Sequence, residues 1–141
     1  MAAMEETLVL VKPDGVERNL TGEVLARIER KGYSLVDIRL VQADRALLAR
    51  HYAEHEGKPF FEPLVEFMQS GPVVAMRVAG NRVIEGFRQL AGATDPTLAA
   101  AGTIRGDFGR DWDAGVILNI VHGSDSPESA ARELEIWFPA R

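Results

Sequence analysis

The sequence of 141 residues contains no cysteine. This absence excludes disulfide bridges and thiolate metal ligands, and it favours a reducing compartment such as the cytoplasm. The first residues carry acids where a signal peptide requires bases, and the apolar run Thr7 to Val11 is too short to span a bilayer. We therefore expect no membrane association.

Excess positive charge is also missing, since the net charge is −5 and the isoelectric point is near 5.2. This balance argues against a broad phosphate-coating surface, so nucleic acid is not an expected partner and any anion site must be local. The sequence has no Walker A motif, nor the glycine-rich loop, HRD and DFG set of protein kinases. The apolar content of 46% fits one domain over residues 1–141.

The pattern of apolar residues predicts alternating strands and helices. Strands are expected at Thr7–Lys12, Ser34–Val41, Val73–Ala79 and Val116–Val121. Helices are expected from the N-caps Thr21, Asp44 and Ser126, over Phe60–Met68 and over Asn81–Leu90, with stops at Gly32, Lys58-Pro59 and Gly71-Pro72. Pro13-Asp14-Gly15 suits a type I turn, and residues 91–115 are expected to form a long surface loop.

Four strands with helices between them favour an α/β fold of the ferredoxin-like, split βαβ kind. In this arrangement we expect a single four-stranded antiparallel sheet that is covered on one side by helices. A doubly wound parallel sheet is the competing topology.

His122 stands where an apolar strand meets the polar turn of NIVHGSDS, residues 119–126. An imidazole titrates near pH ~6.5, and a carboxylate such as Glu133 could hold one ring nitrogen and leave the other as a nucleophile or base. By itself the motif is weak, and a strand-end histidine satisfied by the turn is the alternative. His51 and His55 could share a helix face and a metal, but two partly exposed helix residues are the more ordinary interpretation.

Taken together, six ordered motifs resemble the nucleoside diphosphate kinase family, and the resemblance runs from Thr7 to Phe138. The motifs are LVKPDGVERNLTGEVLARIERKGY, HYAEHEGKPFF, SGPVVAM, RQLAGATDP, GTIRGDF and NIVHGSDS. The resemblance implies transfer of the γ-phosphoryl group of a nucleoside triphosphate to a nucleoside diphosphate, in two ping-pong steps through a phosphohistidine. It also implies Mg²⁺ carried by the nucleotide.

The resemblance assigns roles to individual residues, and elementary chemistry is compatible with them. His122 is the expected nucleophile, oriented by Glu133 and supported by Ser124 and Tyr52. The residues expected to bind the nucleotide are Lys12, Phe60, Leu64, Arg88, Thr94, Arg105 and Asn119, of which Lys12 also lies near the γ-phosphate. Stacking on Phe60 would tolerate every base. Asp125 is expected to contact Mg²⁺ through water, in keeping with the lack of a dedicated metal cage.

The match to the family is weakest over residues 109–118, which are a few residues longer than usual. Leu118 replaces an arginine that often precedes the asparagine, and Ala101 stands where a proline is common. The resemblance further implies a homo-oligomer, with a hexamer built from dimers favoured over a tetramer. Two rival hypotheses are a catalytically idle nucleotide or nucleic-acid binder, and a histidine phosphocarrier or phosphatase that does not use nucleotides.

Overall fold

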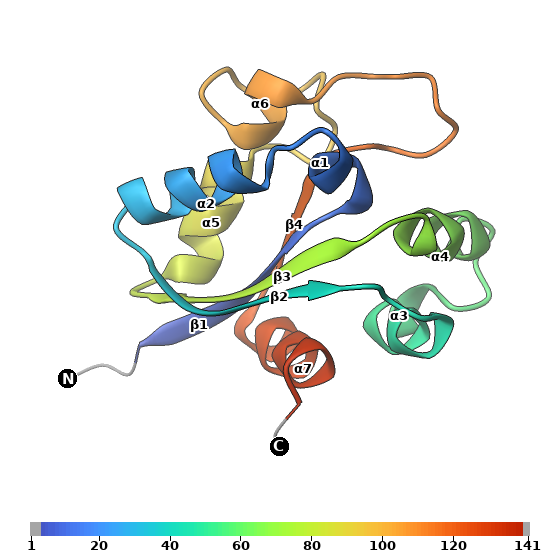
Figure 1. Cartoon of the computed structure of the whole chain (residues 1–141), viewed down its shortest axis with the longest axis horizontal. Coiled ribbons are helices and arrows are strands. Elements are labelled where there is room, and N and C mark those ends of the chain that lie inside the picture. The colour runs from blue at the N-terminus through green and yellow to red at the C-terminus, as the bar shows by residue number, and fades with distance from the viewer. Residues whose placement is uncertain (1–3, 140–141) are drawn as a thin grey trace.

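The computed structural model describes residues 4–139, and its centre is a four-stranded antiparallel sheet (Figure 1). The strands are β1 (Glu5–Val11), β2 (Ser34–Val41), β3 (Val73–Gly80) and β4 (Val121–Gly123), and they lie in the order β2-β3-β1-β4. This order and the antiparallel pairing are those of a ferredoxin-like fold, as the sequence predicts. The competing parallel topology is excluded.

Seven α-helices and one short 3₁₀ helix surround the sheet in the described part of the chain. The α-helices are α1 (Pro13–Glu17), α2 (Thr21–Arg30), α3 (Arg45–His51), α4 (Phe61–Gln69), α5 (Val83–Ala91), α6 (Ile104–Phe108) and α7 (Pro127–Trp137), and the 3₁₀ helix is η1 (Ala53–His55). None of these helices is both long and apolar enough to cross a membrane.

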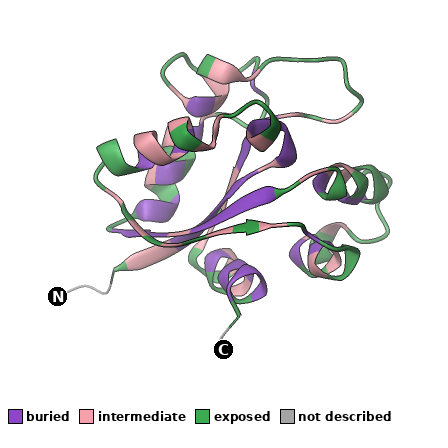
Figure 2. Ribbon diagram, in the orientation of Figure 1, coloured by how far each residue is buried: buried purple, intermediate pink, exposed green. Residues whose placement is uncertain are grey.

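Helices cover both faces of the sheet, so the expectation of one covered face is wrong (Figure 1). The reason is visible along β1, where every residue from Thr7 to Val11 is buried (Figure 2). Leu8 and Leu10 belong to a core that includes residues of α3, α4 and α7, whereas Val9 and Val11 belong to a second core with residues of α2 and α5. Because successive strand residues point to opposite faces, a continuous apolar strand requires cover on both sides.

Most of the predicted strands and helices lie where they are expected, although several of their ends differ. Asp44 caps α3 by accepting the Leu47 N–H at 2.8 Å, and Ser126 caps α7 through the Ser129 N–H at 3.1 Å. Thr21, in contrast, is the first residue of α2 and provides no side-chain cap, since Leu20 occupies the cap position.

Other helix boundaries also differ from the prediction. The expected type I turn at 13–15 is the start of helix α1, in which proline at the first position suits a helix as well as a turn. Helix α3 ends at His51, before the expected break, and the chain continues through η1. Helix α5 begins at Val83, two residues after Asn81, because Arg82 adopts a left-handed conformation.

The segment between α5 and β4 departs furthest from the prediction. Residues 91–115 were expected to lack regular structure, yet Thr103 caps α6 by accepting the Gly106 N–H at 2.9 Å. The expected strand over residues 116–121 is absent, and β4 begins only at Val121. Ile117 is 58% exposed, and Ile120 has a φ of +72°, which is incompatible with an extended strand.

Candidate active site

Strand β4 and helix α7 bring three polar side chains together at one end of the sheet. His122 pairs with Leu10 of β1 in the antiparallel register, which fixes the backbone of the histidine. Glu133 lies on the buried face of α7, and Ser124 lies in the connection between β4 and α7. The capped start of α7 therefore sets where the carboxylate of Glu133 meets the histidine.

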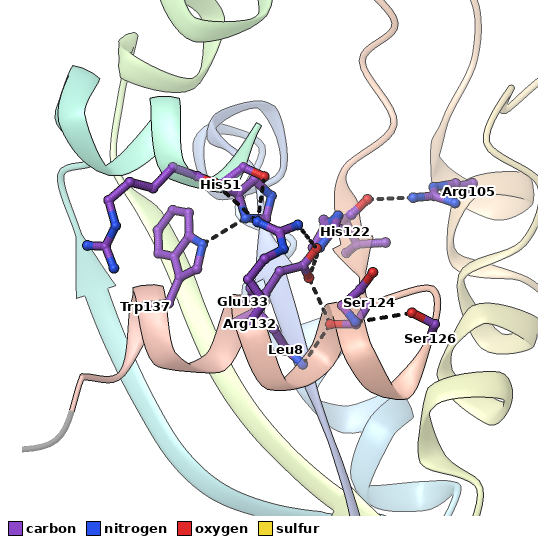
Figure 3. Close-up of polar contacts among 12 residues, drawn as sticks. Leu8, His51, Arg105, His122, Ser124, Ser126, Arg132, Glu133 and Trp137 are labelled. Carbon is purple, nitrogen blue, oxygen red and sulfur yellow. Dashed lines mark hydrogen bonds and ion pairs between the residues drawn. The ribbon is translucent and has the colours of Figure 1, made fainter. Parts of the chain in front are cut away.

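A chain of hydrogen bonds connects these side chains to the sheet (Figure 3). The Leu8 N–H donates to Ser124 Oγ at 3.3 Å, the Ser124 hydroxyl donates to Glu133 Oε1 at 2.8 Å, and His122 Nε2 lies 2.8 Å from the same oxygen. Because an ionised carboxylate only accepts, His122 Nε2 carries the proton and Nδ1 keeps a free lone pair.

Glu133 is only 6% exposed. Burial raises the pKa of Glu133, but the hydrogen bonds and charges of its histidine neighbours and Ser124 outweigh burial and bring the pKa below its ordinary value. Glu133 is therefore ionised at neutral pH and can stabilise positive charge on the His122 ring.

A second histidine, His51, packs against His122 from helix α3. The two ring centroids are 4.9 Å apart at an interplanar angle of 77°. Trp137 Nε1–H donates to His51 Nδ1 at 3.1 Å (Figure 3), and burial followed by the nearby His122 lowers the pKa of His51 to about 3. Since the indole only donates, neutral His51 carries its proton on Nε2.

His122 opens into a cavity of about 260 Å³ whose wall carries four lysine and arginine side chains. These are Lys12, Arg88, Arg105 and Arg132. Burial, and then repulsion from Arg105, lowers the pKa of Lys12 to about 8, and burial with repulsion from Arg88 lowers the pKa of Arg105 to about 10. Because these positive charges repel one another, a bound anion would relieve the repulsion, and the cavity wall is suited to bind one.

The basic groups differ in how many of their donors are already used. Arg105 donates to the backbone carbonyls of Asn119 at 3.1 Å, Gly92 at 2.9 Å and Val121 at 2.6 Å, which leaves two of its five N–H groups. Within residues 4–139, Arg88 has no ion-pair partner, and it also borders an adjoining hollow of about 640 Å³. The guanidinium of Arg88 therefore has more free N–H groups than that of Arg105, and it is better suited to bind a phosphate through two parallel hydrogen bonds.

Asn119 is held between the basic wall and the neighbouring loop. Its Oδ1 accepts from Lys12 Nζ at 2.9 Å, and its Nδ2 donates to the carbonyl of Thr94 at 3.0 Å. Asn119 is 4% exposed. The amide and the ammonium thus form one preorganised pair at the cavity wall.

Two groups of side chains near the cavity are candidates for binding a metal ion. Ligand atoms of His51, His122 and Glu133 lie within 4.8 Å of one another, but the indole N–H already occupies His51 Nδ1, and Mg²⁺ prefers oxygen ligands. Asp125 also lines the cavity, and a hydrogen bond from Ser129 keeps the pKa of its carboxyl below the ordinary value. One ionised carboxylate beside an anion site fits a magnesium ion that arrives with a polyphosphate.

Comparison with known proteins gives a consistent result. The sequence profile of the family described as nucleoside diphosphate kinase matches residues 5–141. The chain belongs to this family. A nucleoside diphosphate kinase from Thermobifida fusca is 61% identical over 136 residues, which cover 96% of this chain and 98% of that protein. Another from Saccharopolyspora erythraea is 62% identical over 96% of this chain and 97% of that protein.

Solved structures of the nucleoside diphosphate kinase family also match the fold. The crystal structure of a family protein from Babesia bovis has a TM-score of 0.90 and 47% sequence identity, and the match covers 96% of this chain and 88% of that one. The structure from Encephalitozoon cuniculi has a TM-score of 0.90 and 39% identity, over 97% and 90% of the two chains. Sequence and fold therefore agree on the family.

Most of the predicted site residues of this family member meet at the cavity. Those that line it are Lys12, Tyr52, Arg88, Thr94, Arg105, Asn119, His122, Asp125 and Glu133. Ser124 is fully buried behind the wall, where its hydroxyl bonds Glu133. Phe60 is 49% exposed outside the cavity, with its ring centroid 5.0 Å from that of cavity-lining His55, and Leu64 packs against the core.

Two contributors to the site have no clear signal in the sequence. His51 was expected to be a partly exposed helix residue, and this is wrong, because it is 4% exposed and contacts His122. Asp14 is 8% exposed and accepts the Ile120 N–H at 3.0 Å. Both contacts join residues more than 70 positions apart, so only tertiary structure could reveal them.

Proposed function

We propose that this protein is a nucleoside diphosphate kinase that carries the phosphoryl group on His122. The observation that carries the proposal is the 2.8 Å contact between His122 Nε2 and Glu133 Oε1. Because Glu133 accepts from Nε2, the lone pair of Nδ1 is free beside a wall of basic side chains. We therefore assign the nucleophilic nitrogen as Nδ1.

The reaction consists of two half-reactions at one site. Nδ1 attacks the γ-phosphorus, the N–P bond forms, and the bond from phosphorus to the bridging oxygen breaks, with its electron pair leaving on the β-phosphate of the nucleoside diphosphate. Glu133 balances the positive charge that the imidazole gains. A terminal phosphate oxygen of a second nucleoside diphosphate then attacks the phosphorus and releases His122.

The cavity residues supply binding and charge stabilisation for this chemistry. Arg88 and the remaining donors of Arg105 bind phosphate oxygens, with Thr94 as a further contact. Lys12 and Asn119, already joined at 2.9 Å, bind the sugar hydroxyls, and Lys12 also reaches the γ-phosphate.

Phe60 supplies the platform for the base. Its exposed ring lies beside His55 at the rim, and stacking on a ring depends little on which base is present. Leu64 is proposed to support this platform from helix α4.

Mg²⁺ is the proposed cofactor, and it would neutralise phosphate charge when bound with the nucleotide. Asp125 would hold it through a water molecule. The chain's own contribution is an ionised carboxylate at the cavity wall. The proposal needs no protein cage for the metal.

Incubation with γ-labelled ATP and Mg²⁺, without an acceptor, tests the proposed function directly. We expect label on the protein that is acid-labile, alkali-stable, absent from His122→Ala and discharged by GDP, CDP and UDP alike. His122→Ala should still bind Mg-ATP, because the phosphate-binding side chains are separate residues. Binding without labelling of the wild type would favour an idle binder. Label that no nucleoside diphosphate discharges would favour a phosphocarrier.

We further propose that the protein forms a homo-oligomer, with a hexamer built from dimers favoured over a tetramer. Strand β2 lies at the edge of the sheet, and three of its alternating apolar side chains are exposed. Val36 is 52%, Ile38 42% and Leu40 71% exposed. An apolar edge strand readily pairs with another strand, and a second copy presents the same edge. Light scattering should give a mass of several chains, and Leu40→Lys should lower it.

We propose that residues 1–141 act as one domain in the cytoplasm, where nucleotides are abundant and a chain without cysteine is well suited to a reducing environment. Neither membranes nor nucleic acids are proposed partners, given the net charge of −5.

A further inference from the structure

A strained turn separates Asn119 from His122. The Val121 N–H donates to the Asn119 carbonyl at 2.7 Å, and the central residue, Ile120, has a φ of +72°. This combination defines the rare form of the three-residue γ-turn. A β-branched residue strongly disfavours positive φ, so the surrounding structure must hold Ile120 in place.

Hydrogen bonds from three residues restrain this turn. Asp14 Oδ2 accepts the Ile120 N–H at 3.0 Å, and the Lys12 N–H donates to the Ile120 carbonyl at 2.8 Å. Arg105 binds the carbonyls of Asn119 and Val121, on either side of the turn. Asp14 is therefore the side chain that holds the amide of the strained residue.

The position of Asp14 is costly if its only task is to stabilise the fold. Its other oxygen, Oδ1, is buried and has no hydrogen-bond partner among the described residues. A half-satisfied buried carboxylate is unfavourable, and the nearby positive charges of Lys12 and Arg105 offset part of this cost. Such a group is typical of a site where geometry matters more than stability.

The turn decides the relative placement of two site residues. Asn119 precedes Ile120 and bonds Lys12, whereas His122 follows it by two residues and bonds Glu133, and both line the same cavity. If Ile120 relaxed to an extended conformation, the peptide groups on either side would rotate and the two side chains would no longer converge.

We propose that Asp14 is a positioning residue, whose carboxylate clamps the Ile120 amide and thereby aligns Asn119 with His122. Asp14 touches no reacting atom. This inference rests on the proposed phosphorylation of His122 for its kinetic test, but not for its structural test.

The kinetic test compares Asp14 variants by the rate at which His122 is labelled under saturating Mg-ATP. Asp14→Ala removes the clamp, and a misplacement of reacting groups on the order of 1 Å lowers the rate about 10²-fold. Asp14→Asn retains an oxygen that can accept the Ile120 N–H, and its rate should stay within about tenfold of the wild type.

Glu5→Ala is the matched control, because Glu5 Oε1 accepts the Ile84 N–H at 2.9 Å, which is also a bond from a carboxylate to the backbone of a distant element. This variant should lose some stability and keep its labelling rate, because Glu5 borders only the adjoining hollow and does not line the cavity around His122. If Asp14→Ala does not fold, Asp14→Leu replaces it, since leucine fills similar space without an acceptor. Thermal unfolding of every variant separates loss of folded protein from loss of rate.

The structural test measures hydrogen exchange of the Ile120 amide by NMR. Exchange should accelerate at least about tenfold in Asp14→Ala and much less in Asp14→Asn. Labelling of Asp14→Ala within twofold of the wild type, unchanged protection of Ile120, or an equal rate loss in both Asp14 variants would overturn the proposal. If the wild-type protein takes no label, the proposed function is wrong. The exchange rate of the Ile120 amide then still tests whether Asp14 holds the turn.

Discussion

Removal of the Glu133 carboxylate gives the sharpest test of how the site controls its histidine. Glu133 Oε1 accepts from His122 Nε2 and from Ser124 Oγ, each at 2.8 Å, and the residue is 6% exposed. In Glu133→Ala, the Nε2–H loses its acceptor and the proton can move to Nδ1. The lone pair of Nδ1, which is required for attack on the phosphorus, is then no longer free on the side of the cavity.

The size of the effect follows from the kind of bond that is lost. A hydrogen bond to a charged group contributes about 1.5–3 kcal/mol. If all of this energy stabilises the transition state, in which the imidazole gains charge, its loss should lower the labelling rate about 10- to 150-fold. This follows because about 1.4 kcal/mol corresponds to one factor of ten. Glu133→Gln keeps an acceptor without charge, and neutral bonds are about half as strong, so we expect a loss of about fivefold.

Quenched-flow labelling with γ-labelled ATP at pH 7 measures this rate. Glu135→Gln is the control, since Glu135 lies two residues further along α7 and is exposed. The control should label as fast as the wild type. A rate for Glu133→Ala within twofold of the wild type would refute the argument that Glu133 sets the protonation of His122.

Three other predictions follow from single contacts. Mg-ATP affinity, measured by calorimetry, should fall as pH rises through about 8, because the pKa of Lys12 is lowered to about 8 and the ammonium loses its charge; Lys12→Met should lack this dependence. Gly123→Ala should cost about 1–3 kcal/mol in urea unfolding, because its Cβ would lie 2.6 Å from Phe87 Cδ2; an unchanged midpoint would contradict this packing. Trp137→Phe should cost about 1–3 kcal/mol in the same assay, since His51 Nδ1 would be buried without a donor; a smaller loss would show that another donor replaces the indole.

The sequence predicted correctly those parts of the fold that are stabilised by contacts between residues close together in the chain. Asp44 and Ser126 cap α3 and α7 as expected, since a cap bond spans only three residues. Strand β2 has the predicted bounds because its alternation reflects one partly buried face. The short helix at Pro13 was mistaken for a turn, as both structures accept the same residues.

The segment before His122 shows where local signals fail. An apolar run rich in branched residues predicts a strand over residues 116–121, and intrinsic preference supports that prediction. The structure instead holds Ile120 at positive φ through bonds to Lys12 and Asp14, more than 100 residues away. Tertiary contacts overrode the preference of the chain at a position next to the site.

By itself, the sequence determined the family, the positions of three strands and five helices, and which side chains could carry the chemistry of His122. These features depend on which residue types are present and on their spacing along the chain, and both can be read directly from the sequence. Only the tertiary structure decided that His51 is buried, that His122 Nε2 faces Glu133, and that Asp14 holds the turn at Ile120. Each of these depends on atoms from distant parts of the chain meeting within about 3–5 Å, a condition that packing alone imposes.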